Sequence, residues 1–406
     1  MENLMTKKIK VAVCGIGNCF SALYQGLSYY KDATADSGSI PGVISMTIGG
    51  YLPADIEIVV AIDVDRRKVG RHVGEAIFAE PNCARVFCKD VPPGPIVQMG
   101  QPLDGISDFM EYEQPAHIGF RVSAELPVDI VKLLKDNEVD ILINYMPVGS
   151  QLATEFYAQA AIDANVAFMN CMPVFIASNP EWEQKFIDAG LPVLGDDMKS
   201  QVGASIVSQA MQELLFDRGA EIDFHAQINM GFNTDFANME VKSRLKSKKI
   251  SKENVIRSQN DLRGVPVPAG SLYAGPAAYV PRGTDEKVAF FDLRARGFGG
   301  APIKLDIRLS VCDSENSAGV VIDAVRYLKV ARELGIVGAL RGPSAATQKT
   351  PPQQMHYADA RKECDALANR ELTAITQKQT TKEDATKYML SQMGNESTAH
   401  LIRTQE

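Results

Sequence analysis

The stretch IKVAVCGIGNCF (residues 9–20) decides the fold of this 406-residue chain. Its first half, Ile9–Cys14, is a short run rich in β-branched and apolar residues, and it ends in Gly15-x-Gly17. Beyond the glycines, apolar side chains recur at helical spacing from Phe20 to Leu27. The pattern predicts a strand, a tight turn and a helix, the opening unit of a dinucleotide-binding fold.

Further strand candidates alternate with helical patterns along the first 200 residues. Residues 32–55, with several glycines and two prolines, indicate loops and short pieces inserted before the second strand. The alternation predicts an α/β fold with an open, doubly wound parallel sheet. The strand candidates are 56–63, 139–144, 166–170 and 192–195, and the helical patterns are 127–136 and 151–164.

The pattern changes after Ala204, where a helix running through Leu215 gives way to period-two alternation. Apolar residues alternate with polar ones from Ile303 to Val311, and 222–230 and 288–294 read as partner strands. A helix from Ser317 then returns the chain to the first unit. We expect a Rossmann domain of 1–202 and 314–380, interrupted by an α+β domain of 203–313 with a mainly antiparallel sheet, and followed by a polar C-terminal tail of 381–406.

Composition restricts the classes of function. The net charge of −8 is spread over both signs, so a nucleic-acid partner is not expected. No apolar run approaches the length of a membrane span, so no membrane partner is expected either. Seven cysteines without a CxxC pair indicate free thiols in a reducing compartment. We expect a cytoplasmic protein.

The glycine turn is a candidate cofactor site. Gly15 and Gly17 allow a close approach of the backbone to a pyrophosphate at a helix N-terminus. Phe20 replaces the usual third glycine, and Asp63 follows Gly15 by 48 positions where about 20 is usual. Asp63 still ends an apolar strand, where it can bind ribose hydroxyls and repel a 2′-phosphate. NAD is therefore favoured over NADP, the alternative being a purely structural turn; the candidates are Gly15, Ile16, Gly17, Asn18, Cys19 and Asp63.

Two other motifs carry possible chemistry. Asp196 and Asp197 follow the last parallel strand, where they can orient a nicotinamide, hold a divalent cation or transfer a proton, unless they only complement a helix dipole. The basic run 246–252 lies near the polar stretch 229–236 and can bind phosphate or stabilise enolate charge, unless it is a solvated loop. Lys287, Asp313 and Lys349 do not stand out individually and read as surface residues.

Six blocks of the chain together resemble the myo-inositol-1-phosphate synthases, particularly the shorter bacterial and archaeal type. They occur in the family's order and span about 15 to 354. The blocks are GIGNCFSALYQGLSYY (15–30), GDDMKSQVGA (195–204), NMGFNTDFANM (229–239), SKKISK (247–252), CDSENSAGVVIDAVR (312–326) and QKTPPQQ (348–354).

The resemblance implies an NAD-containing enzyme, tetrameric through its second domain, that converts D-glucose 6-phosphate to 1L-myo-inositol 1-phosphate. Bound NAD+ oxidises C5, the ketone acidifies C6, the resulting enolate attacks the C1 aldehyde, and NADH reduces the C5 ketone. The net reaction is an isomerisation. Some members of the family are stimulated by divalent or monovalent cations, so a cation is a possible second cofactor and the metal ligands stay undefined.

The resemblance also implies roles for individual residues. Lys248 and Lys287 stabilise oxyanions, and Lys349, with Asp313 nearby, transfers a proton at the C5 oxygen. Further roles are the phosphate site for Lys252 and Ser200, substrate positioning for Asn233 and Asp235, and the nicotinamide for Asp197.

Three alternatives remain open. A related synthase acting on another hexose phosphate, such as fructose 6-phosphate, would use the same motifs. A simple NAD-dependent dehydrogenase would turn over cofactor stoichiometrically. A non-catalytic NAD-binding protein would have no evident need for Lys248, Lys252, Lys287 and Lys349 together.

Overall fold

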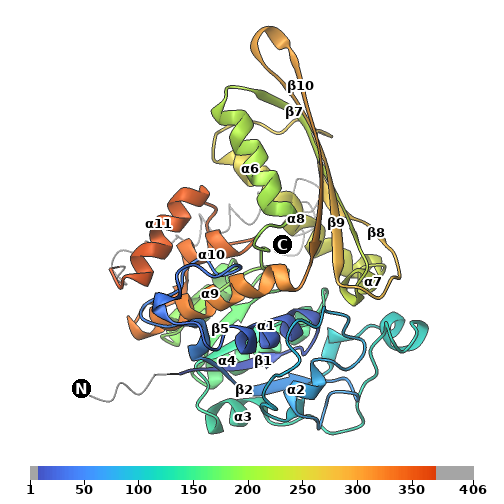
Figure 1. Ribbon diagram of the computed structural model, residues 1–406, viewed down its shortest axis with the longest axis vertical. Helices are drawn as coiled ribbons and strands as arrows, with labels where there is room; N and C mark the ends of the chain where they lie inside the picture. The colour runs from blue at the N-terminus through green and yellow to red at the C-terminus, as the bar shows by residue number, and fades with distance from the viewer. Residues whose placement is uncertain (1–7, 372–406) are drawn as a thin grey trace, which may run out of the picture.

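The computed structural model describes residues 8–371, except for the side chains of 242–243, 245–249 and 277. The predicted tail of 381–406 and the last part of the first predicted domain, 372–380, lie outside the described residues. Two sheets make up the structure: a seven-stranded sheet in the lower half and a four-stranded sheet standing above it (Figure 1). None of the described helices has the length and apolar character needed to cross a membrane.

The lower sheet is parallel, with the order β11-β6-β5-β4-β1-β2-β3. Its central strands are buried on both faces, as expected when helices cover both sides. The doubly wound fold predicted from the sequence is confirmed. The strands are β1 (Ile9–Cys14), β2 (Ile56–Asp63), β3 (Val97–Met99), β4 (Ile141–Asn144), β5 (Ala167–Asn170), β6 (Pro192–Leu194) and β11 (Gly338–Ala339).

Helices from both ends of the chain cover the lower sheet. On one face, α1 (Asn18–Tyr29) packs with α9 (Glu315–Glu333) and α11 (Tyr357–Ala368) in a single apolar core. The other face is covered by α3 (Ile130–Asp136), α4 (Gln151–Asp163) and α5 (Pro180–Asp188). Because α9 and β11 follow the upper sheet in the sequence, the chain leaves the lower unit and returns to it.

The upper sheet is mixed, with the order β10-β9-β7-β8. β9 pairs antiparallel with β7 and β10, and β8 lies parallel to β7. Apolar side chains of β10, alternating from Ile303 to Leu309, pack under α6 (Ala204–Asp217). The strands are β7 (Glu221–Gly231), β8 (Leu272–Tyr279), β9 (Glu286–Arg296) and β10 (Pro302–Cys312).

The basic run 246–252 lies in the 20-residue helix α8 (Lys242–Asp261), so the interpretation of a solvated loop is wrong. α8 contacts α6 and β8. Many of its buried side chains are polar, among them Ser251, Asn254 and Ser258. The helix therefore lacks the apolar stripe by which a sequence pattern reveals a helix.

Candidate active site

A cavity of about 240 Å³ lies where the two sheets meet. It is lined by the glycine turn after β1, by the segment after β6, and by residues of the upper sheet and of α8. Most of the predicted site residues lie on its wall: Gly15, Gly17, Asn18, Cys19, Asp63, Asp197, Ser200, Asn233, Asp235, Lys252, Lys287, Asp313 and Lys349.

Two predicted residues do not line the cavity by a described side chain. The side chain of Ile16 is fully buried, and its backbone N–H donates a hydrogen bond to Asp63 Oδ2. Lys248 belongs to α8, but its side chain lies outside the described residues.

The glycine turn has the geometry that a dinucleotide phosphate needs. Gly15 has φ +96°, and a Cβ there would lie 2.5 Å from the carbonyl oxygen of Tyr145. A Cβ on Gly17 would meet nothing within 4 Å. Gly17 is the N-cap of α1 and has no side chain to bond the first N–H groups of that helix. These groups are therefore available to an anion in the cavity.

Asp63 holds this turn in place. Its Oδ2 accepts a hydrogen bond from Ile16 N at 2.7 Å, and its Oδ1 accepts from Val64 N at 2.7 Å and Asp65 N at 2.9 Å. The residue predicted to bind ribose thus also orders the phosphate-binding loop, although it lies on the cavity wall.

Lys68 stabilises the same turn by contacts to Ile16 and Asp63, and it was not predicted from the sequence. Its Nζ donates to Ile16 O at 2.7 Å and to Asn82 Oδ1 at 2.9 Å, and lies 3.9 Å from Asp63 Oδ2. Burial lowers the pKa of Lys68, while the nearby carboxylate of Asp63 opposes that shift. No pattern in the sequence distinguishes this lysine from a surface residue.

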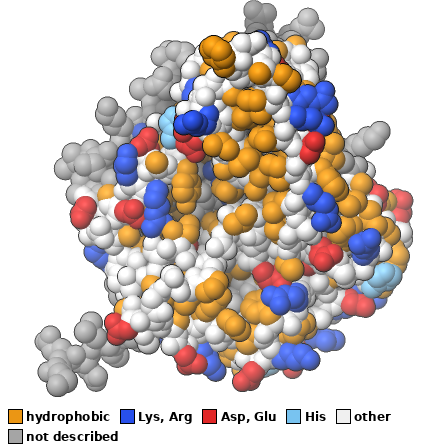
Figure 2. Space-filling model, turned by 45° about the horizontal axis from the view of Figure 1, so that its top comes forward, with side chains coloured by type: hydrophobic (Ala, Val, Ile, Leu, Met, Phe, Trp, Pro, Cys, Tyr) orange, Lys and Arg blue, Asp and Glu red, His pale blue; other side chains and the backbone are white. Residues whose placement is uncertain are grey.

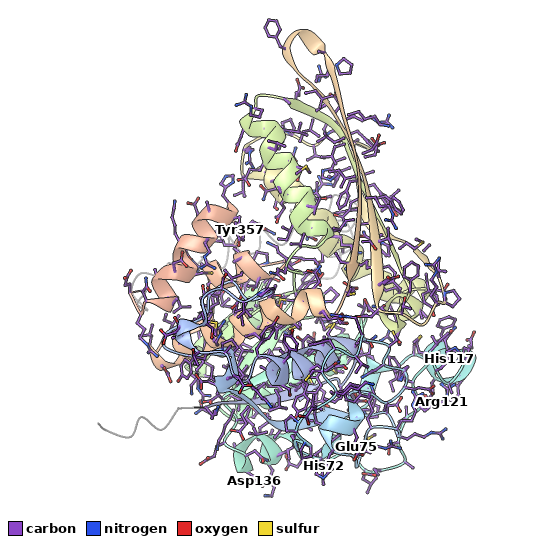
Figure 3. The ribbon with its side chains drawn as sticks, viewed as in Figure 1. His72, Glu75, His117, Arg121, Asp136 and Tyr357 are labelled. Atoms are coloured by element: carbon purple, nitrogen blue, oxygen red, sulfur yellow. The ribbon has the colours of Figure 1, made fainter. Side chains whose placement is uncertain are left out.

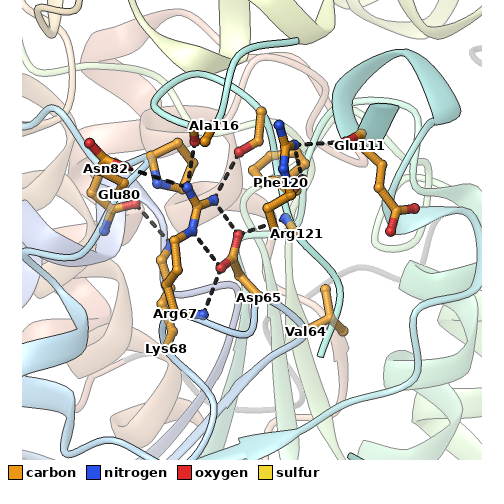
Figure 4. A network of polar contacts seen from close by, with 12 residues as sticks. Val64, Asp65, Arg67, Lys68, Glu80, Asn82, Glu111, Ala116, Phe120 and Arg121 are labelled. Carbon is orange, nitrogen blue, oxygen red and sulfur yellow. Dashed lines mark hydrogen bonds and ion pairs between the residues drawn. The ribbon is translucent and has the colours of Figure 1, made fainter. Parts of the chain in front are cut away.

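A polar network anchors the segment 109–121 to Asp65 and Arg67, just after β2 (Figure 4). Arg67 bonds Asp65 at 2.5 Å and Gly119 O at 2.8 Å, and Arg121 N donates to Asp65 Oδ2 at 3.0 Å. Burial alone would raise the pKa of Asp65, but hydrogen bonds from Arg67 bring it below the ordinary value. The network places Phe120 on the cavity wall.

Asp197 and Lys349 form one ion pair at the cavity. Lys349 Nζ donates to Asp197 Oδ1 at 2.7 Å and to Met198 O at 2.7 Å, while Ser251 Oγ donates to Asp197 Oδ2 at 2.5 Å. The backbones are also joined, because Lys349 N donates to Asp197 O at 2.7 Å. Asp197, with φ +62°, is thereby held by both its main chain and its side chain.

Asp196 faces a different environment from that of its neighbour. Its carboxylate accepts hydrogen bonds from Asn170 Nδ2 at 2.7 Å, from Ser178 Oγ at 2.8 Å and from three backbone N–H groups. Burial raises its pKa to about 6, against the effect of these donors. Asp196 and Asp197 therefore do not converge on one point. Within residues 8–371, the structure groups no three His, Cys, Asp or Glu side chains as a metal site.

A second ion pair joins Lys287 at the start of β9 to Asp313 just after β10. Lys287 Nζ lies 2.5 Å from Asp313 Oδ1, and the two side chains are 16% and 19% exposed. Lys349 is 14% exposed, so the surface interpretation of all three residues is wrong. The structure pairs Asp313 with Lys287, and Lys349, near which the resemblance implies Asp313, lines the same cavity.

Asp285 lies beneath this second pair and was missed by the sequence reasoning. Its Oδ1 accepts from Asn233 Nδ2 at 2.9 Å, its Oδ2 from Ser314 N at 2.9 Å, and its carbonyl from Asp313 N at 2.7 Å. Burial, together with the charge of Asp313, raises the pKa of Asp285 to about 7. The only sequence signal was its place two residues before Lys287.

The remaining polar wall comes from α7 (Thr234–Asn238) and α8. Asn233 caps α7 by accepting a hydrogen bond from Phe236 N at 3.2 Å, which places Asp235 on the cavity wall. Lys252 is 6% exposed and its Nζ lies 5.9 Å from the Phe236 ring centroid. Ser200 completes the wall near the start of α6.

A further buried lysine lies behind the first ion pair. Lys199 Nζ donates to Ala345 O at 2.8 Å, and burial, with the charge of Lys349, lowers its pKa to about 7. No histidine of the described chain lines the cavity; His72 and His117 lie at the edge of the lower unit (Figure 3). The ionised groups on this wall are lysines and carboxylates, which can transfer protons or stabilise oxyanions.

The chain is similar in sequence and fold to several known proteins. The family model of myo-inositol-1-phosphate synthase matches residues 203–314. The inositol-3-phosphate synthase of Mycolicibacterium smegmatis is 46% identical over 364 residues, which cover 89% of this chain and 98% of that protein. The Mycobacterium tuberculosis inositol-3-phosphate synthase is 44% identical over 348 residues, covering 86% and 92%.

A crystal structure of a myo-inositol-1-phosphate synthase-related protein from Thermotoga maritima has the same fold, with a TM-score of 0.74 at 22% identity over 89% of this chain and 98% of that one. Identity well above 30% over almost the whole length of the two mycobacterial relatives decides the family. The chain belongs to the inositol-3-phosphate synthase family.

Proposed function

We propose that this enzyme converts D-glucose 6-phosphate to 1L-myo-inositol 1-phosphate with NAD as a resident cofactor. The observation that carries the proposal is the convergence of two kinds of group on one cavity. The glycine turn and the N-terminus of α1 line the same cavity as the ion pairs Lys349–Asp197 and Lys287–Asp313. A cyclisation by oxidation, aldol closure and reduction needs both kinds of group within one site.

The residues of the turn fit the cofactor. Gly15, Gly17 and the N-terminus of α1 would hold its pyrophosphate, and Asp63 would face its adenosine ribose. Bound NAD supplies a hydride acceptor for C5 and returns the same hydride at the end of the cycle. Asn18 contributes indirectly, because its Oδ1 accepts hydrogen bonds from Cys83 N at 2.7 Å and Ala84 N at 3.0 Å.

The lysines would manage the charge on substrate oxygens. Lys349, whose Nζ pairs with Asp197, would exchange a proton with the C5 hydroxyl. Lys287, whose Nζ pairs with Asp313, would stabilise the enolate and the aldol alkoxide. Lys252 and Ser200 would bind the phosphate, while Asn233 and Asp235 position the substrate, and the family resemblance adds Lys248 to the oxyanion site.

We also propose a homotetramer formed through the upper sheet. One face of that sheet is covered by α6, and its other face exposes Ile228, Tyr273 and Phe290, each about 40% exposed. Hydrophobic side chains gather in the upper half of the molecule (Figure 2). An exposed apolar sheet face of this kind favours association with further copies of the chain. Light scattering of the purified enzyme tests this assembly.

Seven free cysteines support a reducing location, and we place the enzyme in the cytoplasm. Fractionation of cells that express a tagged chain tests this placement.

One assay tests the reaction. The purified enzyme is incubated with glucose 6-phosphate and a catalytic amount of NAD+, products are identified by NMR, and NADH is followed by absorbance. Inositol phosphate without net NADH supports the proposal. Steady NADH accumulation without a cyclised product would instead indicate a dehydrogenase. A cyclised product formed only from fructose 6-phosphate would indicate a synthase with a different substrate. Parallel assays with a chelator or added potassium test the cation that the resemblance implies.

A further inference from the structure

A row of buried polar side chains runs along β7 beneath the cavity. His225, Gln227 and Asn229 alternate along the strand and therefore share one face, the face that packs against α6. Ser208 of α6 contacts this row (Figure 1 shows α6 beside β7). The four side chains are at most 1% exposed, and Gln227 and Asn229 line the cavity.

The four residues form a continuous hydrogen-bonded chain. His225 Nε2 lies 3.0 Å from Ser208 Oγ, and Ser208 Oγ donates to Gln227 Oε1 at 2.9 Å. Gln227 Nε2 donates to Asn229 Oδ1 at 3.3 Å, and Asn229 Nδ2 donates to the backbone oxygen of Gly275 at 2.9 Å.

The backbone carbonyl of Gly275 sets the direction of the whole chain, because it can only accept. Asn229 must therefore present its amide nitrogen to Gly275 and its oxygen to Gln227. Gln227 must then present nitrogen to Asn229 and oxygen to Ser208. Ser208 uses its single proton in the hydrogen bond to Gln227, so its oxygen must accept a hydrogen bond from His225 Nε2. Each member thus has one orientation that satisfies its neighbours.

The state of His225 agrees with this direction. Burial lowers its pKa to about 4, so the ring is neutral near pH 7. Among the described residues nothing bonds to its Nδ1. A neutral ring with its proton on Nε2 leaves only an acceptor unpaired, whereas a proton on Nδ1 would leave a buried donor unpaired and break the bond to Ser208.

The consequence lies at the cavity wall. The amide oxygen of Gln227 accepts a hydrogen bond from Ser208, and the amide oxygen of Asn229 accepts one from Gln227. Neither amide can therefore turn its oxygen toward the cavity without breaking one of these hydrogen bonds. Gln227 Nε2 carries a second proton that Asn229 does not use. The chain therefore fixes the orientation of the Gln227 amide, which lines the cavity and keeps one N–H of Nε2 that its neighbours do not use.

We propose that Gln227 donates a hydrogen bond to an oxygen of the hexose phosphate, and that Ser208 and His225 are positioning residues that keep its amide from rotating. The inference rests on the proposed function and extends it. An N–H donor on an amide that cannot rotate favours substrate oxygens that gain negative charge during the reaction. Gln227 is then one of the residues that determine substrate specificity.

The test compares four variants of the full-length enzyme. Gln227→Met removes the donor at nearly constant volume, and Ser208→Ala removes the group that fixes the amide. Ser208→Thr keeps the hydroxyl, and Gln212→Met is the matched control: it is equally buried on α6, but its hydrogen bonds run to Ile256 O and Asn260 of α8. Each variant is measured for melting temperature, NAD+ affinity, and kcat and KM with glucose 6-phosphate.

The expected result is a fall of about tenfold in kcat/KM for Gln227→Met and Ser208→Ala, the effect of one lost hydrogen bond, with NAD+ affinity unchanged. Ser208→Thr should stay within about threefold of the wild type, and Gln212→Met should change the melting temperature but not kcat/KM. Wild-type kinetics in both Gln227→Met and Ser208→Ala would overturn the inference. Absence of inositol phosphate with the wild-type enzyme would overturn the proposed function instead, so the two failures are distinguishable.

Discussion

Lys349 Nζ lies 2.7 Å from Asp197 Oδ1, although 152 positions separate the two residues in the chain. The contact is supported by backbone hydrogen bonds between the two segments, since Asp196 N donates to Thr350 O at 2.9 Å and Thr350 N to Asp196 O at 3.0 Å. The lysine that the proposed reaction needs at C5 is thus held by main-chain pairing as well as by charge.

Replacing Lys349 by alanine is expected to lower kcat by about 10²–10⁴, the usual contribution of a positioned proton-transfer group. NAD+ binding should remain, because Lys349 pairs with Asp197 and Met198, whereas the pyrophosphate is expected at the glycine turn. The measurements are steady-state turnover and NAD+ titration. Lys362→Ala is the control, because this lysine is exposed and pairs only with Asp359 of its own helix among the described residues. Full activity of Lys349→Ala would remove this residue from the mechanism.

Lys287 and Asp313 are expected to act as a unit. Lys287→Met and Asp313→Asn should each lower kcat by about 10²–10³, as for the loss of one oxyanion-stabilising group. The double variant should be little worse than the poorer single variant, because each change removes the same ion pair. A double-mutant cycle on kcat measures the coupling. Strictly additive effects would mean that the 2.5 Å contact does not orient the lysine.

The two glycines of the turn should respond differently to a side chain. Gly15→Ala is expected to destabilise the fold by about 1–3 kcal/mol, because φ is +96° and the new Cβ would lie 2.5 Å from Tyr145 O. Gly17→Val should leave the melting temperature nearly unchanged, since a Cβ there meets nothing within 4 Å, and should weaken NAD+ binding instead. Thermal denaturation and NAD+ titration separate the two effects. Unchanged NAD+ affinity in Gly17→Val would place the cofactor elsewhere.

Asp285 should make the free energy of unfolding depend on pH. Its carboxyl loses its proton near pH 3.8 in the unfolded chain but only near about 7 in the folded one. The folded state therefore binds the extra proton between these values, so this contribution to stability is full below about pH 4 and decreases as the pH rises to about 7. The slope reaches about 1.4 kcal/mol per pH unit at most.

Asp285→Asn removes the titrating group and should flatten this part of the curve. The measurement is urea denaturation of wild type and variant at several pH values between about 4 and 7. Asp196 and Asp323, whose pKa values are also raised by burial, titrate equally in both proteins. Their contribution cancels in the difference. Parallel curves would show that Asp285 is ionised throughout this range.

Much of the architecture follows from local pattern. The β-branched runs of β1 and β2 were predicted with the bounds that the structure has, because a strand buried on both faces is a continuous apolar run. The alternation in β10 likewise predicted a strand with one covered face. Elements that were not predicted include β8, which contains Gly275 and Pro276, the two-residue β11, and α8, whose buried side is largely polar. None of these carries an apolar period.

The sequence by itself determined the family, the glycine turn and many of the residues around the cavity, because contiguous motifs carry that information. Tertiary structure alone decided which lysine pairs with which carboxylate, that Asp285 supports the second pair, and that Gly275 orients the chain from His225 to Asn229. The physical reason is that these contacts depend on strand register and on the pairing of 196–199 with 347–350. Both bring together side chains that are far apart in the sequence, and no periodic pattern of residues indicates such contacts.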